Sequence, residues 1–150
     1  LWMGFLSLVV SQWIFGSGDL IVLNPDGLLI IPNSDLLWRF GLAMGLAFLA
    51  LWTVATLSLA FSALAKNSVG PIVITMAVII LFTLIGTLDV TVFDEVKFYL
   101  FTTHMAAWRI VFEEPFPKQN ILQSVGVLIG HIVGLLAFTL FYFNRKDITS

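Results

Sequence analysis

Residues 36–88 read LLWRFGLAMGLAFLALWTVATLSLAFSALA, then KNS, then VGPIVITMAVIILFTLIGTL. The first apolar run, Leu36–Ala65, contains one charge, Arg39, and the second run, Val69–Leu88, contains none. Each run is long enough for a span, because about 20 apolar residues cross a hydrocarbon core of about 30 Å. The polar break at Lys66-Asn67-Ser68 belongs in water or among lipid head groups. The stretch therefore predicts a transmembrane hairpin.

The composition of the whole chain is that of a membrane protein. Hydrophobic residues make up 59% and charged residues 11%, whereas soluble domains have about 45–50% and about 25%. We therefore expect an all-α membrane protein, and 150 residues leave room for three or four spans but for no separate soluble catalytic domain. The net charge of -2, without a basic stripe, argues against nucleic acid binding. With no cysteine in the chain, disulfides, thiolate metal sites and a cysteine nucleophile are excluded.

Leu1–Phe15 is a shorter apolar run at the start of the chain. At about 1.5 Å per residue it covers only about 22 Å, less than a hydrocarbon core. We interpret it as the outer part of a span whose beginning is missing, which makes the chain the C-terminal portion of a longer protein. A signal peptide is the disfavoured alternative, because the run lacks a basic start and a small-residue cleavage pattern.

Gly16–Asp35 has the composition of a loop, with glycines, two prolines and three aspartates. Asn24-Pro25-Asp26-Gly27 is a strong turn signal. The flanking pieces Leu20–Leu23 and Leu28–Ile31 either pair as short strands or lie on the membrane surface, and the sequence leaves both open.

Arg39 lies near the start of the first long run, next to Trp38. A guanidinium there can extend to the head groups, and tryptophan suits the interfacial belt, so both are expected at the membrane surface. Gly41 and Gly45 have the GxxxG spacing that lets helices approach closely, and we expect them to form an ordinary packing face.

The region between Leu88 and Ile121 is too charged to span a membrane. Thr91-Val92-Phe93-Asp94 resembles a capping box, and Pro115 is a helix stop. Between them, apolar residues recur at helical spacing, namely Phe93, Val96, Leu100, Phe101, Met105, Trp108 and Phe112.

This pattern predicts two short amphipathic, re-entrant helices within Thr91–Pro117 that dip into the outer leaflet. We expect the turn between them near Thr102-Thr103-His104, covered by the neighbouring spans. Arg109 is expected to pair with Glu113 one turn on.

Ile121–Phe143 is the last full span, and it ends at Asn144-Arg145-Lys146. The fold prediction is thus about four transmembrane helices, the first truncated, with the two short helices between the last two spans. Lys66 and Lys146 must face the same side, because an even number of spans separates them. Basic density close to the span ends favours the cytosol for both, with the acidic loops outside.

The order of these elements resembles the C-terminal half of a permease of the ABC-2 type. The likeness is carried by residues 57–68, LSLAFSALAKNS, the following Pro71-led span, the charged two-helix loop, and a last span ending in Arg145-Lys146-Asp147. It covers most of the chain from Leu36 onward. Leu1–Phe15 is then the preceding span.

The resemblance implies a six-span subunit that works as two copies side by side, driven by a separate ATP-binding cassette ATPase on the cytosolic face. It also implies a bacterial or archaeal plasma membrane. The first spans, the amphipathic helix that precedes them and the cytosolic coupling helix of that family have no counterpart in these 150 residues.

Sites for covalent chemistry are not expected in this chain. A P-loop needs Gly before Lys, and the residues before the four lysines are Ala65, Val96, Pro117 and Arg145. No catalytic, cofactor-binding or metal-ligating residues are predicted, because neither His104 nor His131 has a second ligand at metal spacing. The four methionines are scattered and read as packing residues.

His131 is the one ionisable group predicted in the middle of a span, among Gly126, Gly130 and Gly134. We expect it to hydrogen-bond a neighbouring helix as a neutral ring. The alternative is a proton relay in a transport pathway.

The favoured function is a permease subunit that forms part of a translocation pathway and does no chemistry itself. Its expected partners are the ATPase, a second permease copy and the lipid bilayer. Two alternatives stay open: a non-transporting membrane anchor or assembly subunit, and a proton-coupled carrier that uses His131. The substrate cannot be read from apolar helix faces.

Overall fold

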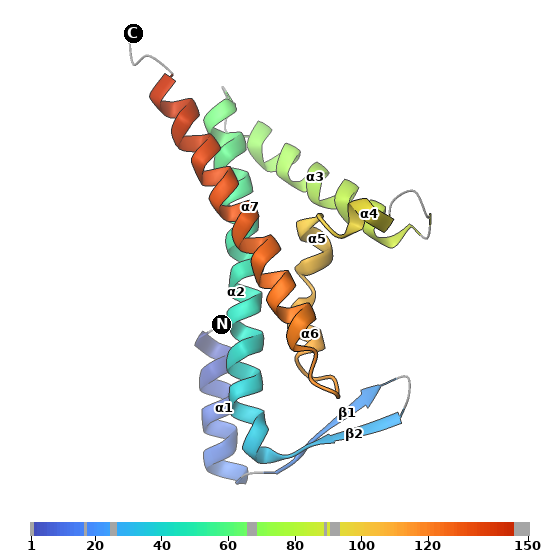
Figure 1. Ribbon diagram of the computed structural model, residues 1–150. Helices are drawn as coiled ribbons and strands as arrows, with labels where there is room; N and C mark the ends of the chain where they lie inside the picture. The colour runs from blue at the N-terminus through green and yellow to red at the C-terminus, as the bar shows by residue number, and fades with distance from the viewer. Residues whose placement is uncertain are drawn as a thin grey trace.

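The computed structural model describes residues 2–16, 18–24, 27–65, 69–88, 90 and 94–145. The elements in chain order are α1 (Trp2–Phe15), β1 (Leu20–Asn24), β2 (Gly27–Ile31), α2 (Asn33–Leu64), α3 (Gly70–Thr87), α4 (Asp94–Lys97), α5 (Phe101–His104), α6 (Ala107–Ile110) and α7 (Lys118–Arg145) (Figure 1). The chain is mostly helical, but the two strands mean that it is not all-α.

Three helices in the described ranges, α2, α3 and α7, are long and apolar enough to cross a membrane. This agrees with an integral membrane protein. The apolar helix α1 has 14 residues, too few for a full crossing. About four spans, the first incomplete, therefore stays a prediction.

The helices α2 and α3 form the pair predicted from residues 36–88. The 32 residues of α2 begin after Pro32, whose backbone is extended at ψ 148°. Asp35 lies in the first turn of α2, where a carboxylate favours the positive end of the helix dipole. In α3, Pro71 occupies the first turn, where its missing N–H breaks no helical hydrogen bond. The predicted turn, residues 66–68, lies outside the described residues.

The helices α2 and α7 pack against each other along much of their length (Figure 1). The buried face of α2 is rich in small residues, because Ala43, Ala50, Ala60 and Ala63 are all buried, and small side chains let helix backbones approach. Gly41 and Gly45 instead lie on an exposed side of α2.

No described atom comes within 4 Å of a Cβ built on Gly41 or Gly45. The expectation that this GxxxG pair forms a packing face is wrong for the part of the chain that the structure describes. Ala43, two positions from each glycine, is buried instead, in a cluster with Ala107 of α6 and Ile121 of α7.

The segment between α3 and α7 forms three single-turn helices, α4, α5 and α6, and not the two longer ones predicted. The predicted turn at residues 102–104 is itself helical, since it lies in α5. The helical run breaks at Leu100, whose backbone is extended at ψ 121°. Of the predicted capping box, residues 91–93 lie outside the described residues.

From Phe101 onward, this segment packs against α2 and α7. Phe101 is 1% exposed and packs with Leu57 and Leu128. Val111 is fully buried and packs with Ala43 and other residues near the start of α2. Leu57 and Ala43 lie about four turns apart on α2, or about 21 Å. Residues 101–111 therefore run along α2 toward its beginning (Figure 1). The two buried contacts, and not the local helical periodicity, determine the course of this segment.

The strands β1 and β2 form an antiparallel hairpin that projects sideways from the foot of α2 (Figure 1). Of the two possibilities that the sequence left open, strand pairing is the one observed. Ile21 and Ile30 pair on one face, which is exposed, whereas Leu20 and Ile31 pair on the other face, which turns toward the protein. We call this end of the molecule the hairpin end.

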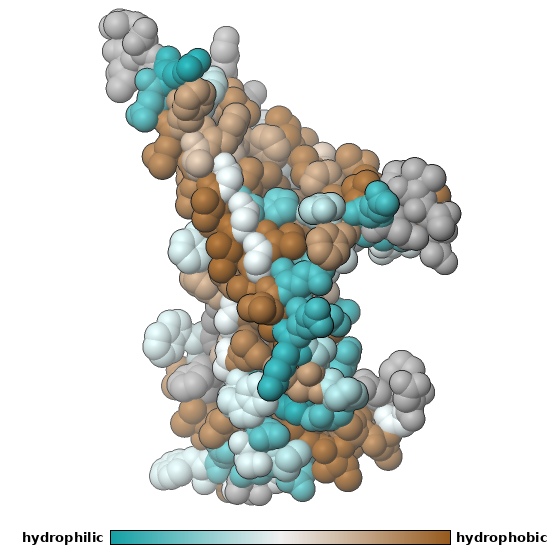
Figure 2. Space-filling model, in the orientation of Figure 1, coloured by the Kyte–Doolittle hydropathy of each residue, from teal (hydrophilic) through white to brown (hydrophobic). Residues whose placement is uncertain are grey.

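The surface of the helices is strongly apolar. Figure 2 shows brown residues over most of α7 and α3, with teal residues gathered at the carboxyl end of α7 and around its start. Exposed polar residues account for these ends, namely Asn144 and Arg145 at one and Lys118, Gln119 and Asn120 at the other. An apolar band bounded by two polar ends matches a bilayer bounded by two water layers.

Candidate functional site

Arg39 lies at the centre of a buried polar cluster at the hairpin end. Its side chain is almost fully buried, with 2% exposure for the residue. Nη1 donates hydrogen bonds to the carbonyl oxygens of Val111 at 3.1 Å and Glu113 at 3.3 Å. Nη2 forms an ion pair with Oε1 of Glu114. The expectation that Arg39 extends to the lipid head groups is therefore wrong.

Two aromatic rings enclose the guanidinium of Arg39. Its Cζ lies 5.4 Å from the ring centroid of Trp38 and 5.5 Å from that of Phe116, and the two rings meet edge to face at 5.0 Å. Cation–π contacts of this kind strengthen when water is excluded. Within the described part of the chain, Nε of Arg39 is buried without a hydrogen-bond partner.

This cluster joins the first turns of α2 to the residues that lead from α6 into α7. The carbonyls of Val111 and Glu113 follow the end of α6, and such carbonyls lack intrahelical donors. Arg39 supplies the donors. A rotation of α2 would therefore carry residues 111–114 and the start of α7 with it.

His104 forms a second buried cluster, between α5 and α7. The residue is 8% exposed. Its Nε2 lies 2.8 Å from the carbonyl oxygen of Phe98, and its Nδ1 lies 3.0 Å from Oγ of Ser124. Because a carbonyl only accepts, Nε2 carries the proton and donates, which leaves Nδ1 of the neutral ring as an acceptor.

The hydroxyl of Ser124 has two possible acceptors in this arrangement. Besides Nδ1 of His104, it lies 2.8 Å from the carbonyl oxygen of Asn120. A hydroxyl has one proton, so it donates to one of the two acceptors at a time. His104 thus ties α5 to α7 through α7's first turns.

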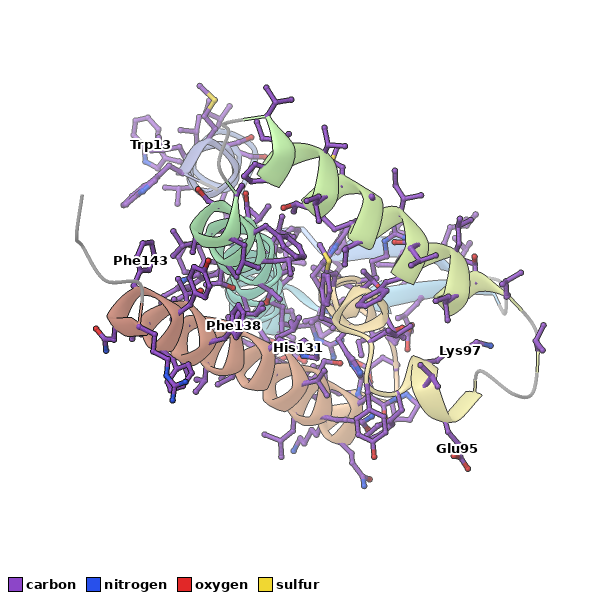
Figure 3. All side chains as sticks on the ribbon, turned by 90° about the horizontal axis from the view of Figure 1, so that it is seen from above. Trp13, Glu95, Lys97, His131, Phe138 and Phe143 are labelled. Carbon is purple, nitrogen blue, oxygen red and sulfur yellow. The ribbon has the colours of Figure 1, made fainter. Side chains whose placement is uncertain are left out.

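His131 has a different environment from the one expected. Its Nδ1 lies 2.9 Å from the carbonyl oxygen of Val127, one turn earlier on the same helix, so the expected hydrogen bond to a neighbouring helix is not what the ring makes. Its ring lies 5.6 Å from that of Phe101, on the side of α7 that faces α5 (Figure 3). His131 also lines a cavity of about 500 Å³ with Tyr99 and residues of α7.

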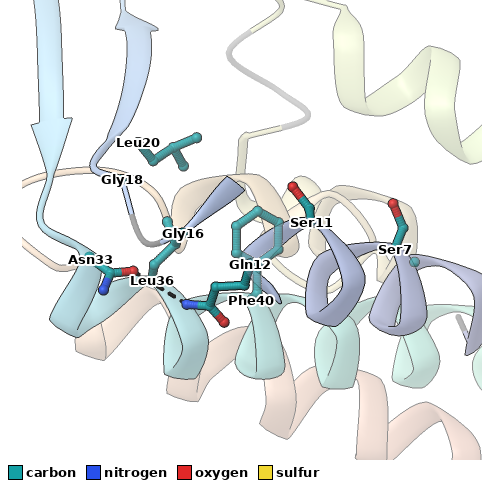
Figure 4. Close-up of a pocket in the computed structure, with 10 residues that line it drawn as sticks. Ser7, Ser11, Gln12, Gly16, Gly18, Leu20, Asn33, Leu36 and Phe40 are labelled. Carbon is teal, nitrogen blue, oxygen red and sulfur yellow. Dashed lines mark hydrogen bonds between the residues drawn. The ribbon is translucent and has the colours of Figure 1, made fainter. Parts of the chain in front are cut away.

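A cavity of about 430 Å³ with both polar and apolar residues in its lining lies between α1 and α2 (Figure 4). Ser7 and Ser11 project into it from the same side of α1, and Nε2 of Gln12 donates to Oδ1 of Asn33 at 3.4 Å. The backbone N–H of Asn33 donates to Oδ1 of Asp19 at 3.1 Å. These contacts hold the end of α1 to the start of α2.

A third cavity, of about 360 Å³, lies between β1 and α6. It is lined by Leu20 and Val22 from β1, Phe40 from α2, and Trp108, Arg109, Phe112 and Glu113 from α6 and the residues that follow it.

The predicted ion pair between Arg109 and Glu113 is not formed among the described residues. The guanidinium carbon of Arg109 lies 5.3 Å from the ring centroid of Trp108 instead. The only ion pair that joins this region to another element within the described ranges is the one from Arg39 to Glu114. Helical spacing predicted a carboxylate as the partner of Arg109, whereas in the structure the guanidinium lies over an aromatic ring.

Within the described ranges, no three His, Cys, Asp or Glu side chains lie together as a metal site would require.

The buried role of Arg39 was missed by sequence reasoning. The usable signal was that Arg39 is the one charge in a run of 30 apolar positions, while the acidic pair Glu113-Glu114 stands next to a proline before another span.

No protein-family model, curated protein or solved structure matches this chain. Its function therefore has to be inferred from its own geometry and sequence pattern.

Proposed function

We propose that this chain is a membrane-spanning permease subunit of the ABC-2 type, which forms part of a translocation pathway and is driven by a separate ATP-binding cassette ATPase. The single observation that carries the proposal is the course of residues 94–117. They follow α3 in the sequence and form single-turn helices, lie along α2 between Phe101 and Val111, and lead into α7 beside the Arg39 cluster. A charged, folded segment at this place between the last two spans agrees with the sequence resemblance.

The positions of the helix ends support the proposed topology. The end of α2, at Leu64, and the end of α7, at Arg145, lie at the end of the molecule opposite the hairpin (Figure 1). In the proposed orientation this end faces the cytosol and the hairpin end faces outward, because Lys66 and Lys146 follow α2 and α7 in the sequence and basic residues near span ends favour the cytosol. The membrane is a bacterial or archaeal plasma membrane.

The proposed mechanism uses rigid movement and not covalent chemistry. Closure of two ATPase subunits on the cytosolic side would tilt α2 and α7, and the partner copy of the permease would supply the other half of the pathway. Arg39 would pass the tilt of α2 to residues 111–114, because its guanidinium holds two of their carbonyls. Buried polar joints of this kind move as units, since separating them leaves unpaired groups.

The test is to purify the protein from its native membrane and to identify ATP-binding subunits that co-purify. ATP hydrolysis is then measured for the chain alone and with its partner. Hydrolysis is expected only with the partner, and it should vanish when the partner's P-loop lysine is replaced. Hydrolysis by the chain alone would contradict the proposal, and the lack of any ATPase partner would favour the anchor alternative.

A further inference from the structure

The cavity between β1 and α6 has two unlike sides. The side formed by β1 and α2 is apolar, whereas the side formed by α6 and the residues that follow it combines two rings with one positive and one negative charge. The first side has Leu20, Val22 and Phe40, and the second has Trp108, Phe112, Arg109 and Glu113. Its volume of about 360 Å³ is at the low end for small-molecule sites, which run from about 300 to about 1,000 Å³. The cavity can hold a polar head group but not two acyl chains.

The two charges are available to a ligand. Arg109 and Glu113 are both exposed, and neither forms an ion pair within the part of the chain that the structure describes. The backbone carbonyl of Glu113 accepts a hydrogen bond from Arg39, which anchors this residue without using its carboxylate. The ring of Trp108 supports the guanidinium of Arg109 at 5.3 Å.

The cavity lies where α2 changes from charged to apolar. Asp35 and Arg39 are the charges near the start of α2, and residues 40–64 contain none. When α2 crosses a bilayer, the hydrocarbon therefore begins near Phe40, which lines the cavity. Trp108 is also suited to this boundary, because its ring prefers the head-group level.

From this arrangement we infer that the cavity binds the head group of a zwitterionic phospholipid, phosphatidylethanolamine. Arg109 binds the phosphate, because a guanidinium matches phosphate oxygens with two parallel hydrogen bonds. Glu113 accepts hydrogen bonds from the ammonium. The glycerol end of the lipid leaves along Phe40 and Leu20 toward the hydrocarbon.

Other head groups fit this pair of charges less well. Phosphatidylglycerol offers a phosphate but no cation for Glu113. Phosphatidylcholine has the cation, but its methylated nitrogen cannot donate a hydrogen bond to a carboxylate. The binding does not depend on the transport activity proposed above, so either idea can fail alone.

The experiment is to strip the purified protein of lipid in detergent and to titrate it with each of the three phospholipids, with bound lipid counted by native mass spectrometry. Arg109→Gln should weaken both phosphatidylethanolamine and phosphatidylglycerol, each by about ten-fold, which corresponds to about 1.4 kcal/mol. Glu113→Gln should weaken phosphatidylethanolamine by a similar factor and leave phosphatidylglycerol unchanged or tighter. Soluble phosphoethanolamine should compete weakly, because it lacks the apolar anchor.

Lys118→Gln and Glu95→Gln are matched controls on exposed residues outside the cavity lining. The first removes a positive charge, as Arg109→Gln does, and the second removes a negative charge, as Glu113→Gln does. Both should leave all three affinities within about two-fold. The inference is overturned if Glu113→Gln weakens phosphatidylglycerol as much as phosphatidylethanolamine, or if Lys118→Gln matches Arg109→Gln. Equal binding of all three lipids to the unaltered protein would overturn it as well. An unchanged melting temperature of each variant shows that folding is intact.

Discussion

The region around Arg39 and the helix α3 differ in how the rest of the chain covers them. Around Arg39, the first turns of α2 and residues 111–116 bring together an ion pair, two carbonyls and two rings. In α3, only Pro71 and Thr75 are buried among the described residues. Figure 1 shows α3 slanting away from α2, with its far end at the height of the middle of α7.

The difference shows which surfaces of an apolar helix require partners in a fixed geometry and which do not. Side chains such as Ile72, Val73 and Met76 are about 60% exposed on α3, and lipid or another subunit can cover them without selecting a precise geometry. The buried arginine needs donors and acceptors in fixed places. Stability should therefore be concentrated at the hairpin end and along α7, and four sets of substitutions test this, from the largest effect to the smallest.

Arg39→Met should have the largest effect, because it leaves the carbonyls of Val111 and Glu113 without donors in a buried place. The free energy of unfolding should fall by about 3 kcal/mol or more, measured by denaturant titration of the lipid-free protein in detergent. Glu114→Gln should cost less than about 1 kcal/mol, because the Glu114 side chain is 41% exposed. A small decrease in the free energy of unfolding for Arg39→Met would show that water can replace the guanidinium and that Arg39 does not hold α2 to residues 111–114.

Leu128→Ala and Ile74→Ala compare the two regions with the same kind of truncation. Leu128 is fully buried, whereas Ile74 is 45% exposed on α3. Leu128→Ala should lower the free energy of unfolding by about 2–5 kcal/mol, and Ile74→Ala by less than about 1 kcal/mol. Equal losses, measured by the same titration, would mean that α3 has a packing partner in the purified protein.

His104→Ala should remove the link between α5 and α7. The carbonyl of Phe98 loses its donor, so the free energy of unfolding should fall by about 1–3 kcal/mol. Ser124→Ala should cost about 1 kcal/mol, and the double variant should cost less than the sum, because the two side chains share one hydrogen bond. Strict additivity of the two losses would argue against that bond.

His131→Gln should have the smallest effect. The ring of His131 bonds to the carbonyl of its own helix turn and is half-buried, so the free energy of unfolding should change by less than about 0.5 kcal/mol. Transport by the assembled protein should keep its rate and its pH profile. A rate that collapses at normal expression would instead support the proton-coupled carrier.

The comparison of the two histidines shows where sequence reasoning was limited. His131 attracted attention because it lies in the middle of an apolar run, which is a local property. His104 lies in a charged stretch and gave no such signal, yet it joins two elements through Phe98 and Ser124. Its partners come together only when residues 101–111 fold back along α2.

The short helices and the hairpin illustrate the same limit. Apolar spacing correctly indicated helical structure between residues 94 and 112, but it did not indicate the breaks between α4, α5 and α6. The segment contributes to two separate buried clusters, Phe101 to one and Ala107 and Val111 to the other, and an unbroken helix is not what the packing selects. The turn signal at residues 24–27 allowed a hairpin, and pairing partners across it decided in favour of strands.

The sequence alone determined that this chain is built for a membrane and where its long helices run. Hydrocarbon thickness, charge avoidance and proline act on contiguous residues, so a linear reading is enough to locate α2, α3 and α7 to within about three residues. Only the tertiary structure decided that Arg39 is a buried joint, that Arg109 lies on Trp108, and that His104 is bridged on both sides. These outcomes depend on which carbonyl, ring or hydroxyl the packing of the helices places beside each side chain, and sequence spacing does not set that.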